Sequence, residues 1–301
     1  MTVIALTGGT GFVGSHVIDR MLATGYQLRA LARRPQPERE GVTWIAGALD
    51  DTATLATLVA GADAVLHVAG VINAPDRAGF AAGNIEGTRN VIAAAQVAGV
   101  RRFIQVSSLA AREPGLSDYG WSKAEADKLL MASDLDWTIV RPPAIFGPRD
   151  QEMLELFRFA KWHAVPLPPA GGRASVIAVE DLARLLVMLP VSNALTRTIV
   201  EPDDGHPDGW DHRDLARAIG AAMGKRVLPL PLPRVVLRVM SSLDRLFRGK
   251  KAKLTADRVR YFCHRDWASH ARPPSDIWAP QADTPAALAA TAAWYRAQGL
   301  L

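Results

Sequence analysis

Two short segments of the chain combine side chains that could carry out chemistry together. The segment from Tyr119 to Lys123 reads YGWSK, which places a phenol and an ammonium four residues, or one helical turn, apart. Residues 7–14 read TGGTGFVG and directly follow the apolar run at residues 3–6. A glycine-rich turn between a strand and a helix is typical of dinucleotide binding. Each segment alone is weak evidence, but together they predict redox chemistry on a nicotinamide cofactor.

The spaced glycines of the first segment each serve a different purpose. Gly8 permits the tight turn that leaves the strand, Gly11 lets the backbone approach a pyrophosphate, and Gly14 lets the new helix lie close to the sheet. The start of that helix offers N–H groups and a positive dipole to phosphates. The alternative is an ordinary strand, turn and helix, which the sequence context disfavours. We therefore predict that the cofactor is bound by Thr7, Gly8, Gly11, Phe12, Val13 and Gly14.

The residues that follow the second predicted strand indicate which nicotinamide cofactor is used. Sites for NAD usually carry an acidic residue here, whereas an arginine suits the 2′-phosphate of NADP. The chain has Arg33 and Arg34, and the first acidic residue after them is Glu38. Because a guanidinium can bind a phosphate in a bidentate manner, we predict NADPH in preference to NADH. The alternative is a solvated basic loop.

The composition limits the class of protein. With 301 residues, of which 49% are hydrophobic, the chain can bury a large core, and one doubly wound domain with an added lobe accounts for its length. The single cysteine, Cys263, excludes an intrachain disulfide and fits a reducing compartment. No signal-peptide pattern or membrane-spanning apolar run is present. We expect a cytoplasmic protein that contacts a membrane, if at all, only at its surface. The seven histidines show no metal-ligand spacing, so no metal site is predicted.

Strands and helices are predicted to alternate through the first half of the chain. Apolar patterns indicate strands at residues 3–6, 27–32, 42–45, 64–68, 102–107 and 137–140, and helices that begin near residues 11, 53, 83 and 119. Such alternation implies a parallel sheet covered on both faces, which is a doubly wound α/β (Rossmann) fold. After Pro142 and Pro143 the regularity ends. We expect an NADP-binding Rossmann domain at residues 1–150 and a smaller substrate lobe at residues 151–301, from which part of the chain returns to the sheet.

Several motifs, in this order along the chain, resemble the short-chain dehydrogenase/reductase superfamily. After the glycine turn come Asp50, HVAG at residues 67–70, NIEGT at 84–88, VSS at 106–108, the Tyr119 and Lys123 pair, and RPPAIFGP at 141–148. The pattern is most similar to the extended and atypical branch, often described as NAD-dependent epimerase/dehydratase, over residues 1 to about 190. The ending TAAWYR at residues 291–296 is similar to the subgroup related to an accessory subunit of respiratory complex I. Members of the superfamily often form homodimers.

The resemblance implies catalytic roles for four residues. Hydride transfer to a carbonyl carbon leaves an alkoxide, which needs a proton and a positive environment. Tyr119 would donate the proton, Lys123 would lower the pKa of that phenol and hold the nicotinamide ribose, and Ser108 would hydrogen-bond the substrate oxygen. Ser107 is the alternative to Ser108. Asn84 resembles the helix asparagine that anchors a proton-relay water, and the alternative for it is a helix N-cap.

The resemblance also implies cofactor contacts outside the glycine turn. Asp50 would meet the adenine, while Ala69 and Gly70 would bring backbone close to the cofactor. Pro142, which follows the sixth predicted strand, is also placed among the cofactor-binding residues. We interpret the nearby His67 as packing in the cofactor pocket rather than as a general base.

One departure from the family pattern bears on the substrate. Members that act on sugar nucleotides usually carry an asparagine in an R-x-x-N-x-x-G-P motif, and this chain has Ala144 at that place. An alanine side chain cannot hydrogen-bond a diphosphate, which disfavours a sugar nucleotide. The neighbouring apolar residues indicate either an apolar pocket or ordinary core, and they are Met153, Leu156, Phe157, Phe159 and Trp162.

The segment at residues 234–253 has the pattern of a basic amphipathic helix. Four arginines fall within roughly 80° of one helical face, and apolar residues occupy the opposite side; the arginines are Arg234, Arg238, Arg245 and Arg248. With Lys250, Lys251 and Lys253 there are seven basic residues against one acidic residue, Asp244. The helix is suited to an anionic membrane surface, and the alternative is that its apolar face packs on the fold. No nucleic-acid-binding module is present, so nucleic acid is not an expected partner.

These observations predict an NADPH-dependent reductase of a carbonyl on a hydrophobic, lipid-like substrate. Within the resembling group, bacterial ceramide reductases combine this type of fold with a lipid substrate, so that oxidised ceramide is the candidate. A nucleotide-sugar epimerase or dehydratase is the first alternative, which Ala144 disfavours. A cofactor-binding accessory subunit without turnover is the second, although loss of the Tyr119 and Lys123 pair would be expected in such a subunit.

Overall fold

The chain consists of two compact units that each contain several segments. The computed structural model describes residues 2–249 and 255–301, apart from the side chains of Arg245 and Arg248. The first unit comprises Met1–Arg141 and Leu182–Glu201, and the second comprises Pro142–Asp181 and Pro202–Leu301. Pro142 opens the second unit, and residues 182–201, which include β11 of the sheet, belong to the first. The boundary that we expected at residue 150 stays a prediction.

The first unit is built on a seven-stranded sheet in which every neighbouring pair is parallel. The strand order is β11-β6-β5-β4-β1-β2-β3. The strands are β1 (Val3–Thr7), β2 (Gln27–Ala32), β3 (Val42–Ala46), β4 (Ala64–His67), β5 (Arg102–Val106), β6 (Asp136–Val140) and β11 (Thr198–Val200). The six strands predicted from the sequence match to within one residue at each end. The predicted doubly wound α/β fold is confirmed.

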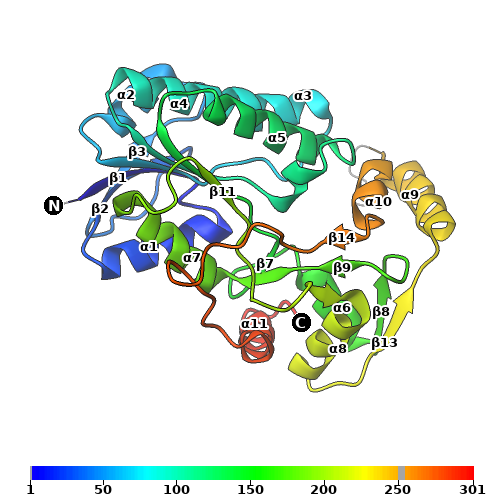
Figure 1. Cartoon of the computed structure of the whole chain (residues 1–301). Coiled ribbons are helices and arrows are strands. Elements are labelled where there is room, and N and C mark those ends of the chain that lie inside the picture. The colour runs from blue at the N-terminus through cyan, green and yellow to red at the C-terminus, as the bar shows by residue number, and fades with distance from the viewer. Residues whose placement is uncertain (1, 250–254) are drawn as a thin grey trace. The chain divides into compact units, whose positions relative to one another are not determined.

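Helices cover both faces of this sheet, with α2, α4 and α5 on one face and α1 on the other (Figure 1). Their bounds are α1 (Phe12–Ala23), α2 (Thr52–Val59), α3 (Arg77–Phe80), α4 (Gly87–Val97) and α5 (Asp118–Met131), with a π-helix η1 (Ala81–Glu86) and 3-10 helices η2 (Leu109–Arg112) and η3 (Leu189–Val191). Helix α7 (Val179–Met188) contributes residues to both units. The central strands are buried on both sides, as β5 shows with all five of its residues, because they lie between two layers of helices. The edge strand β3 has no buried residue.

One helix starts earlier than the sequence predicts. We expected a helix that begins near residue 83, but α3, η1 and α4 form one continuous helical run from Arg77. Asp76 precedes this run, and its side chain accepts a hydrogen bond of 2.9 Å from the Gly79 N–H. This N-cap fixes the start of the helix, because a carboxylate oxygen satisfies one of the N–H groups that the first turn leaves without a partner.

The second unit joins short strands to helices around a separate core. Its strands are β7 (Ala144–Phe146), β8 (Ala164–Leu167), β9 (Arg173–Ala174), β10 (Val176–Ala178), β12 (Trp210–Asp211), β13 (Leu228–Pro231) and β14 (Asp266–Trp267). They form the sheets β10-β7, β12-β9-β14 and β13-β8. Its remaining helices are α6 (Leu154–Lys161), α8 (His212–Ala222), α9 (Arg234–Arg248), α10 (Ala256–Phe262) and α11 (Thr284–Ala297). None of the helices among the described residues is long and apolar enough to cross a bilayer.

Three of the five apolar residues noted after Ala144 belong to the core of the second unit, and two are exposed. Met153 and Phe157 are buried in a cluster with Leu288 and Tyr295, and Leu156 packs against this cluster. Phe159 and Trp162 are exposed instead. Of the two interpretations that the sequence left open, ordinary core therefore holds for Met153, Leu156 and Phe157, because α6 and its caps divide the five side chains between core and solvent.

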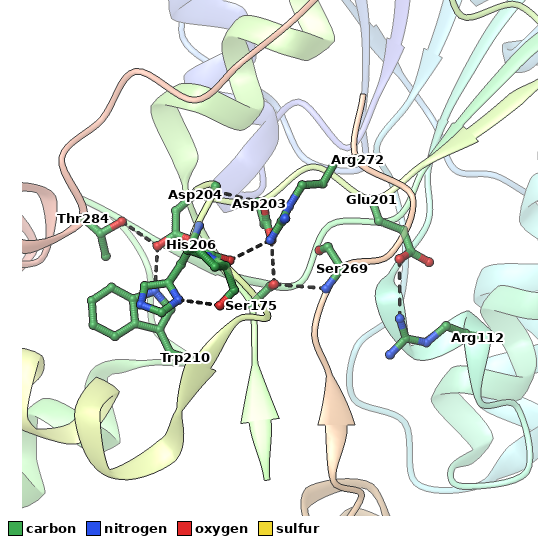
Figure 2. A network of polar contacts seen from close by, with 12 residues as sticks. Arg112, Ser175, Glu201, Asp203, Asp204, His206, Trp210, Ser269, Arg272 and Thr284 are labelled. Carbon is green, nitrogen blue, oxygen red and sulfur yellow. Dashed lines mark hydrogen bonds and ion pairs between the residues drawn. The ribbon is translucent and has the colours of Figure 1, made fainter. Parts of the chain in front are cut away.

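A buried carboxylate holds several loops of the second unit together, as Figure 2 shows. Arg272 binds Asp203 through two hydrogen bonds of 2.7 and 2.8 Å, and Ser175 donates a third of 2.7 Å. The Ser269 N–H donates to the Ser175 hydroxyl at 3.0 Å. A bidentate guanidinium and a hydroxyl donor compensate the removal of the Asp203 carboxylate from water. The interaction joins three segments that lie far apart in the sequence, around residues 175, 203 and 269–272.

Tyr295 links helix α11 to the loop before α6. Its ring is fully buried against Phe157, and its hydroxyl donates a 3.0 Å hydrogen bond to Asp150. The same carboxylate accepts hydrogen bonds from the Glu152 and Met153 N–H groups. Burial raises the pKa of Asp150, and burial beside this carboxylate raises the pKa of Tyr295, so the phenol remains a donor.

We predict that Tyr295→Phe lowers the free energy of unfolding by about 1–3 kcal/mol, because a buried carboxylate loses one donor without a replacement. Chemical denaturation followed by circular dichroism measures the change. Tyr26→Phe is the matched control, since Tyr26 is only half-buried and an equal loss in both variants would contradict the prediction.

Candidate active site

The carboxyl ends of β1 and β4 meet where the strand order reverses. β4 lies on one side of β1 and β2 on the other, so the connections from these strands run to opposite sides. In the register of this pair, Thr7 lies beside His67. Ligands of open α/β sheets bind at such a reversal, outside the carboxyl ends of the strands. We therefore expect the cofactor site at the residues that follow β1 and β4.

The glycine turn after β1 leaves no room for side chains at two positions. Gly8 has φ +75°, and a Cβ atom there would lie 2.5 Å from the Ala69 nitrogen. A Cβ atom on Gly14 would lie 2.1 Å from the Gly8 carbonyl oxygen. We predicted that Gly8 permits the tight turn, which fits its positive φ, and that Gly14 lets the helix lie close to the sheet. The atoms that a Cβ atom on Gly14 would meet belong to Gly8 and Gly9 of the turn itself.

Gly11 differs from these two glycines because it lies at the exposed N-cap of α1. A Cβ atom there would meet the Gly8 oxygen at 3.3 Å and no other described atom within 4 Å. No side chain caps the helix start, and the first turn of α1 contains no acidic residue. This open backbone with a positive dipole end fits the pyrophosphate of a dinucleotide. Phe12 and Val13 form the first turn of α1 and are half-buried.

The other predicted cofactor residues lie at several places around the sheet. Arg33 and Arg34 are exposed directly after β2. Asp50 is exposed in the turn before α2, where the neighbouring Asp51 acts as the N-cap. Pro142 is buried and belongs to the second unit.

His67 is a buried neutral imidazole between two hydroxyl groups. Its ring nitrogens lie 2.7 Å from the Thr7 hydroxyl and 2.9 Å from the Thr88 hydroxyl. The Thr7 hydroxyl also accepts a 3.2 Å hydrogen bond from the Ala69 N–H. Burial, assisted by the charge of Lys123, lowers the pKa of His67 to about 3. The imidazole therefore supports the backbone after β4, and it carries no charge at neutral pH.

Lys123 and Asn84 come together at Gly70. A methyl group on Gly70 would lie 3.3 Å from the Asn84 Oδ1 atom and 3.4 Å from the Lys123 Nζ atom. Lys123 is buried and donates a 2.8 Å hydrogen bond to the Val106 carbonyl at the end of β5. Burial lowers the pKa of Lys123 to about 8, against the opposing effect of Asp127. The ammonium therefore lies beside the backbone that follows β4, within a part of the structure shielded from water.

Asn84 bridges three segments from inside the π-helix η1. Its Oδ1 accepts from the Val71 N–H at 2.7 Å, and its Nδ2 donates to the Val71 carbonyl at 2.9 Å and to the Ser122 hydroxyl at 2.8 Å. The N-cap alternative for Asn84 is wrong, because Asp76 caps the helical run eight residues earlier. A π-turn inside a helix is frequent at functional sites, where it redirects one side chain.

Tyr119 and Ser108 lie at the ends of two helices that pack together. Tyr119 is half-buried in the first turn of α5, its ring lies near Phe80, and its carbonyl accepts a 2.8 Å hydrogen bond from Ser122. Ser108 is the half-buried N-cap of η2, and its hydroxyl accepts from the Ala110 N–H at 3.2 Å. The start of α5 approaches η2 closely, since a Cβ atom on Gly120 would lie 2.6 Å from the Ala110 oxygen.

Sequence reasoning missed the residues that support Lys123 and Asn84. Asp127, one turn after Lys123 on α5, accepts hydrogen bonds from Gln105 at 2.7 Å and from Arg141 at 2.8 Å. Burial raises the pKa of Asp127, and Arg141, Ser107 and Lys123 oppose this effect. The spacing Lys-x-x-x-Asp is the signal that could have identified Asp127, because residues four apart on a helix lie on one face. Ser122, which joins Asn84 to the Tyr119 backbone, has no comparable signal.

Comparison with known proteins identifies the family to which the chain belongs. The family model described as NAD(P)H-binding matches residues 8–187. A ceramide reductase of Caulobacter vibrioides is 35% identical over 99% of this chain and 96% of its own length.

Solved structures share the fold at lower sequence identity. The structure of MoeE5 in complex with UDP-glucuronic acid and NAD has a TM-score of 0.77 at 19% identity, and covers 99% of this chain and all of that one. The UDP-N-acetylglucosamine 4-epimerase of Bacillus cereus has a TM-score of 0.71 at 16% identity, over 98% of this chain and 97% of the epimerase. At these identities the likeness concerns the fold.

The family match covers more than half of the chain, and the reductase similarity covers nearly all of it. The chain therefore belongs to the NAD(P)H-binding family, and it is an NAD(P)-dependent enzyme of the extended short-chain dehydrogenase/reductase type.

Proposed function

We propose that this enzyme is an NADPH-dependent reductase of a ketone on a hydrophobic lipid substrate, with oxidised ceramide as the candidate. The observation that carries the proposal is the similarity to the Caulobacter ceramide reductase along nearly the whole length of both chains. The substrate-binding parts of this superfamily differ more than the nucleotide-binding parts do, so similarity that extends beyond residue 187 has particular weight.

The residues after β1 and β2 would hold the cofactor. The open backbone at Gly11 and the first turn of α1 suit the pyrophosphate, and the exposed Arg33 and Arg34 suit a 2′-phosphate. When bound, the nicotinamide supplies the hydride for reduction of a carbonyl. An ammonium has three N–H donors, and Lys123 uses one of them on Val106, which leaves donors for the hydroxyl groups of the cofactor ribose.

Tyr119 would supply the proton. A carbonyl oxygen gains negative charge during reduction, and a phenol in the first turn of α5 can protonate it. The Lys123 ammonium, one turn further along the same helix, would stabilise the resulting phenolate. Ser108 would hydrogen-bond the substrate oxygen, and the Asn84 amide would hold a water that returns a proton to Tyr119. Ser122 contributes to this arrangement by connecting Asn84 to the Tyr119 backbone.

The first prediction of the proposed function concerns the reaction itself. Purified protein should oxidise NADPH in the presence of a 3-keto ceramide in detergent micelles, and Tyr119→Phe should lower the rate by about 10²–10⁴-fold through loss of the proton donor. The variant should bind NADPH as tightly as the parent, and Tyr26→Phe should retain the parent rate.

The possible outcomes separate the proposal from its alternatives. Turnover of a UDP-sugar with retained NAD, and none of the keto lipid, would point to an epimerase or dehydratase. If NADPH binds but neither substrate is consumed, a binding subunit becomes the better interpretation.

The second prediction concerns pH. Because the pKa of Lys123 is lowered to about 8, the ammonium is present below that pH and is lost above it. We expect kcat/KM for keto-lipid reduction to fall as the pH rises through about 8, and Lys123→Arg to move this fall to higher pH. Lys128→Arg, an exposed change on the same helix, should leave the profile unchanged. An alkaline fall that stays in place in Lys123→Arg would assign it to another group.

The third prediction concerns cofactor choice. Replacing Arg33 and Arg34 together by alanine should weaken NADPH binding by about tenfold or more and leave NADH binding nearly unchanged, because a 2′-phosphate loses its charged partners. Isothermal titration with each cofactor measures both constants. Arg20→Ala, an exposed change on α1, is the control, and equal losses for the two cofactors would refute the assignment to NADPH.

A further inference from the structure

Helix α9 presents an apolar face to solvent. Phe247 is 82% exposed, Leu246 is 76% exposed and Val235 is 68% exposed. Four more large apolar residues on the helix are also exposed, and they are Val236, Val239, Met240 and Leu243. At 100° per residue, all seven lie within an arc of about 140° on one side of the helix. The alternative raised by the sequence, that this face packs on the fold, is wrong for the described residues.

A different side of α9 faces the rest of the second unit. Ser241 is buried, and Leu237 and Asp244, one turn before and after it, are half-buried. The guanidinium of Arg234 donates a 3.4 Å hydrogen bond to the Cys263 carbonyl, and α10 lies alongside (Figure 1). At 100° per residue Ser241 lies on the same side as the arginines, so the helix is attached along that side and keeps its apolar arc available.

Further exposed apolar side chains lie in the segments that flank α9 in the sequence. Leu228 and Leu230 are exposed on β13, six and four residues before the helix, and Phe262 is exposed at the end of α10. With the seven residues of α9, these make ten of the sixteen large apolar side chains that are exposed in the described part of the chain. Such concentration marks an interaction surface, because single exposed apolar residues are normally scattered.

The charge of this segment restricts what the surface can bind. Residues 234–253 contain seven basic residues and one acidic residue, a net charge of +6, whereas the whole chain has +5. Of these, Arg234 and Arg238 are described, while Lys250, Lys251 and Lys253 lie outside the described residues, as do the side chains of Arg245 and Arg248. A second copy of the chain is disfavoured, because a symmetric contact would bring two basic segments together.

We infer that α9 lies in the plane of an anionic lipid bilayer, with its apolar arc in the acyl boundary and its basic residues at the lipid headgroups. A helix with a wide apolar face and an arginine-rich polar face is suited to this position. Anionic lipids complement the local positive charge, which nothing in the neighbouring sequence balances. The inference goes beyond the proposed reaction and does not depend on which ketone is reduced.

Vesicle flotation with the full chain tests this inference. Vesicles of phosphatidylcholine with phosphatidylglycerol are compared with vesicles of phosphatidylcholine alone, without ceramide or nucleotide. We expect at least about tenfold more binding to the anionic vesicles at low salt, with the difference shrinking as salt is added. Because no substrate is present, failure of the reductase assay and failure of this test are independent.

Variants of the exposed face supply the controls. Leu243→Asp with Phe247→Asp should lower vesicle binding by about tenfold or more, since two carboxylates would enter the acyl boundary. Val97→Asp makes the same kind of change on α4, where Val97 is 91% exposed, and should bind like the parent. The thermal unfolding midpoint of both variants should match the parent, because these side chains contribute little to the core.

Two results would overturn the inference. One is a parent chain that ignores anionic vesicles, or that floats equally well with the two aspartates. The other is a parent that is dimeric by light scattering, does not float, and becomes monomeric in the double variant, since a second copy would then cover the face.

Discussion

The candidate site depends on the burial of one positive charge, the Lys123 ammonium. Removal of an ammonium from water costs several kcal/mol unless hydrogen bonds and an opposite charge compensate. The Val106 carbonyl at the end of β5 and the Asp127 carboxylate on α5 provide this compensation. Asp127 is itself fully buried, so it needs Arg141 after β6 and Gln105 within β5. These interactions join α5 to β5 and to the end of β6, beside the backbone that follows β4.

The local signals in the sequence were sufficient to predict six of the seven strands of the first unit. These strands are rich in apolar residues because the central part of the parallel sheet is buried on both faces, and the glycine turn marks where β1 ends. Gly8 could be assigned to the tight turn because its φ of +75° favours glycine, which is a local requirement of the backbone. Prediction worked where a residue type is required by its immediate neighbours.

Features that depend on distant contacts could not be derived in the same way. The three-residue strand β11 pairs with β6 across nearly sixty residues, and its sequence alone does not distinguish it from a loop. Asn84 fits an N-cap and a bridging position equally well until its contacts with Val71 and Ser122 are known. Asp127 looks like an ordinary helical carboxylate, because its burial results from the packing of α5 against the sheet.

Helix α9 was predicted correctly as a helix, but its contacts could not be predicted from the sequence. Its periodicity identified an apolar face and a basic face, but periodicity does not say what each face contacts. In the structure the strip around Ser241 faces the unit, and the seven apolar side chains do not. Burying apolar surface stabilises a protein by about 25 cal/mol per Å², and this fold leaves that stabilisation unused. A face that folding does not bury is consistent with the bilayer location inferred above, and the lipid substrate proposed for this enzyme would be found in the same bilayer.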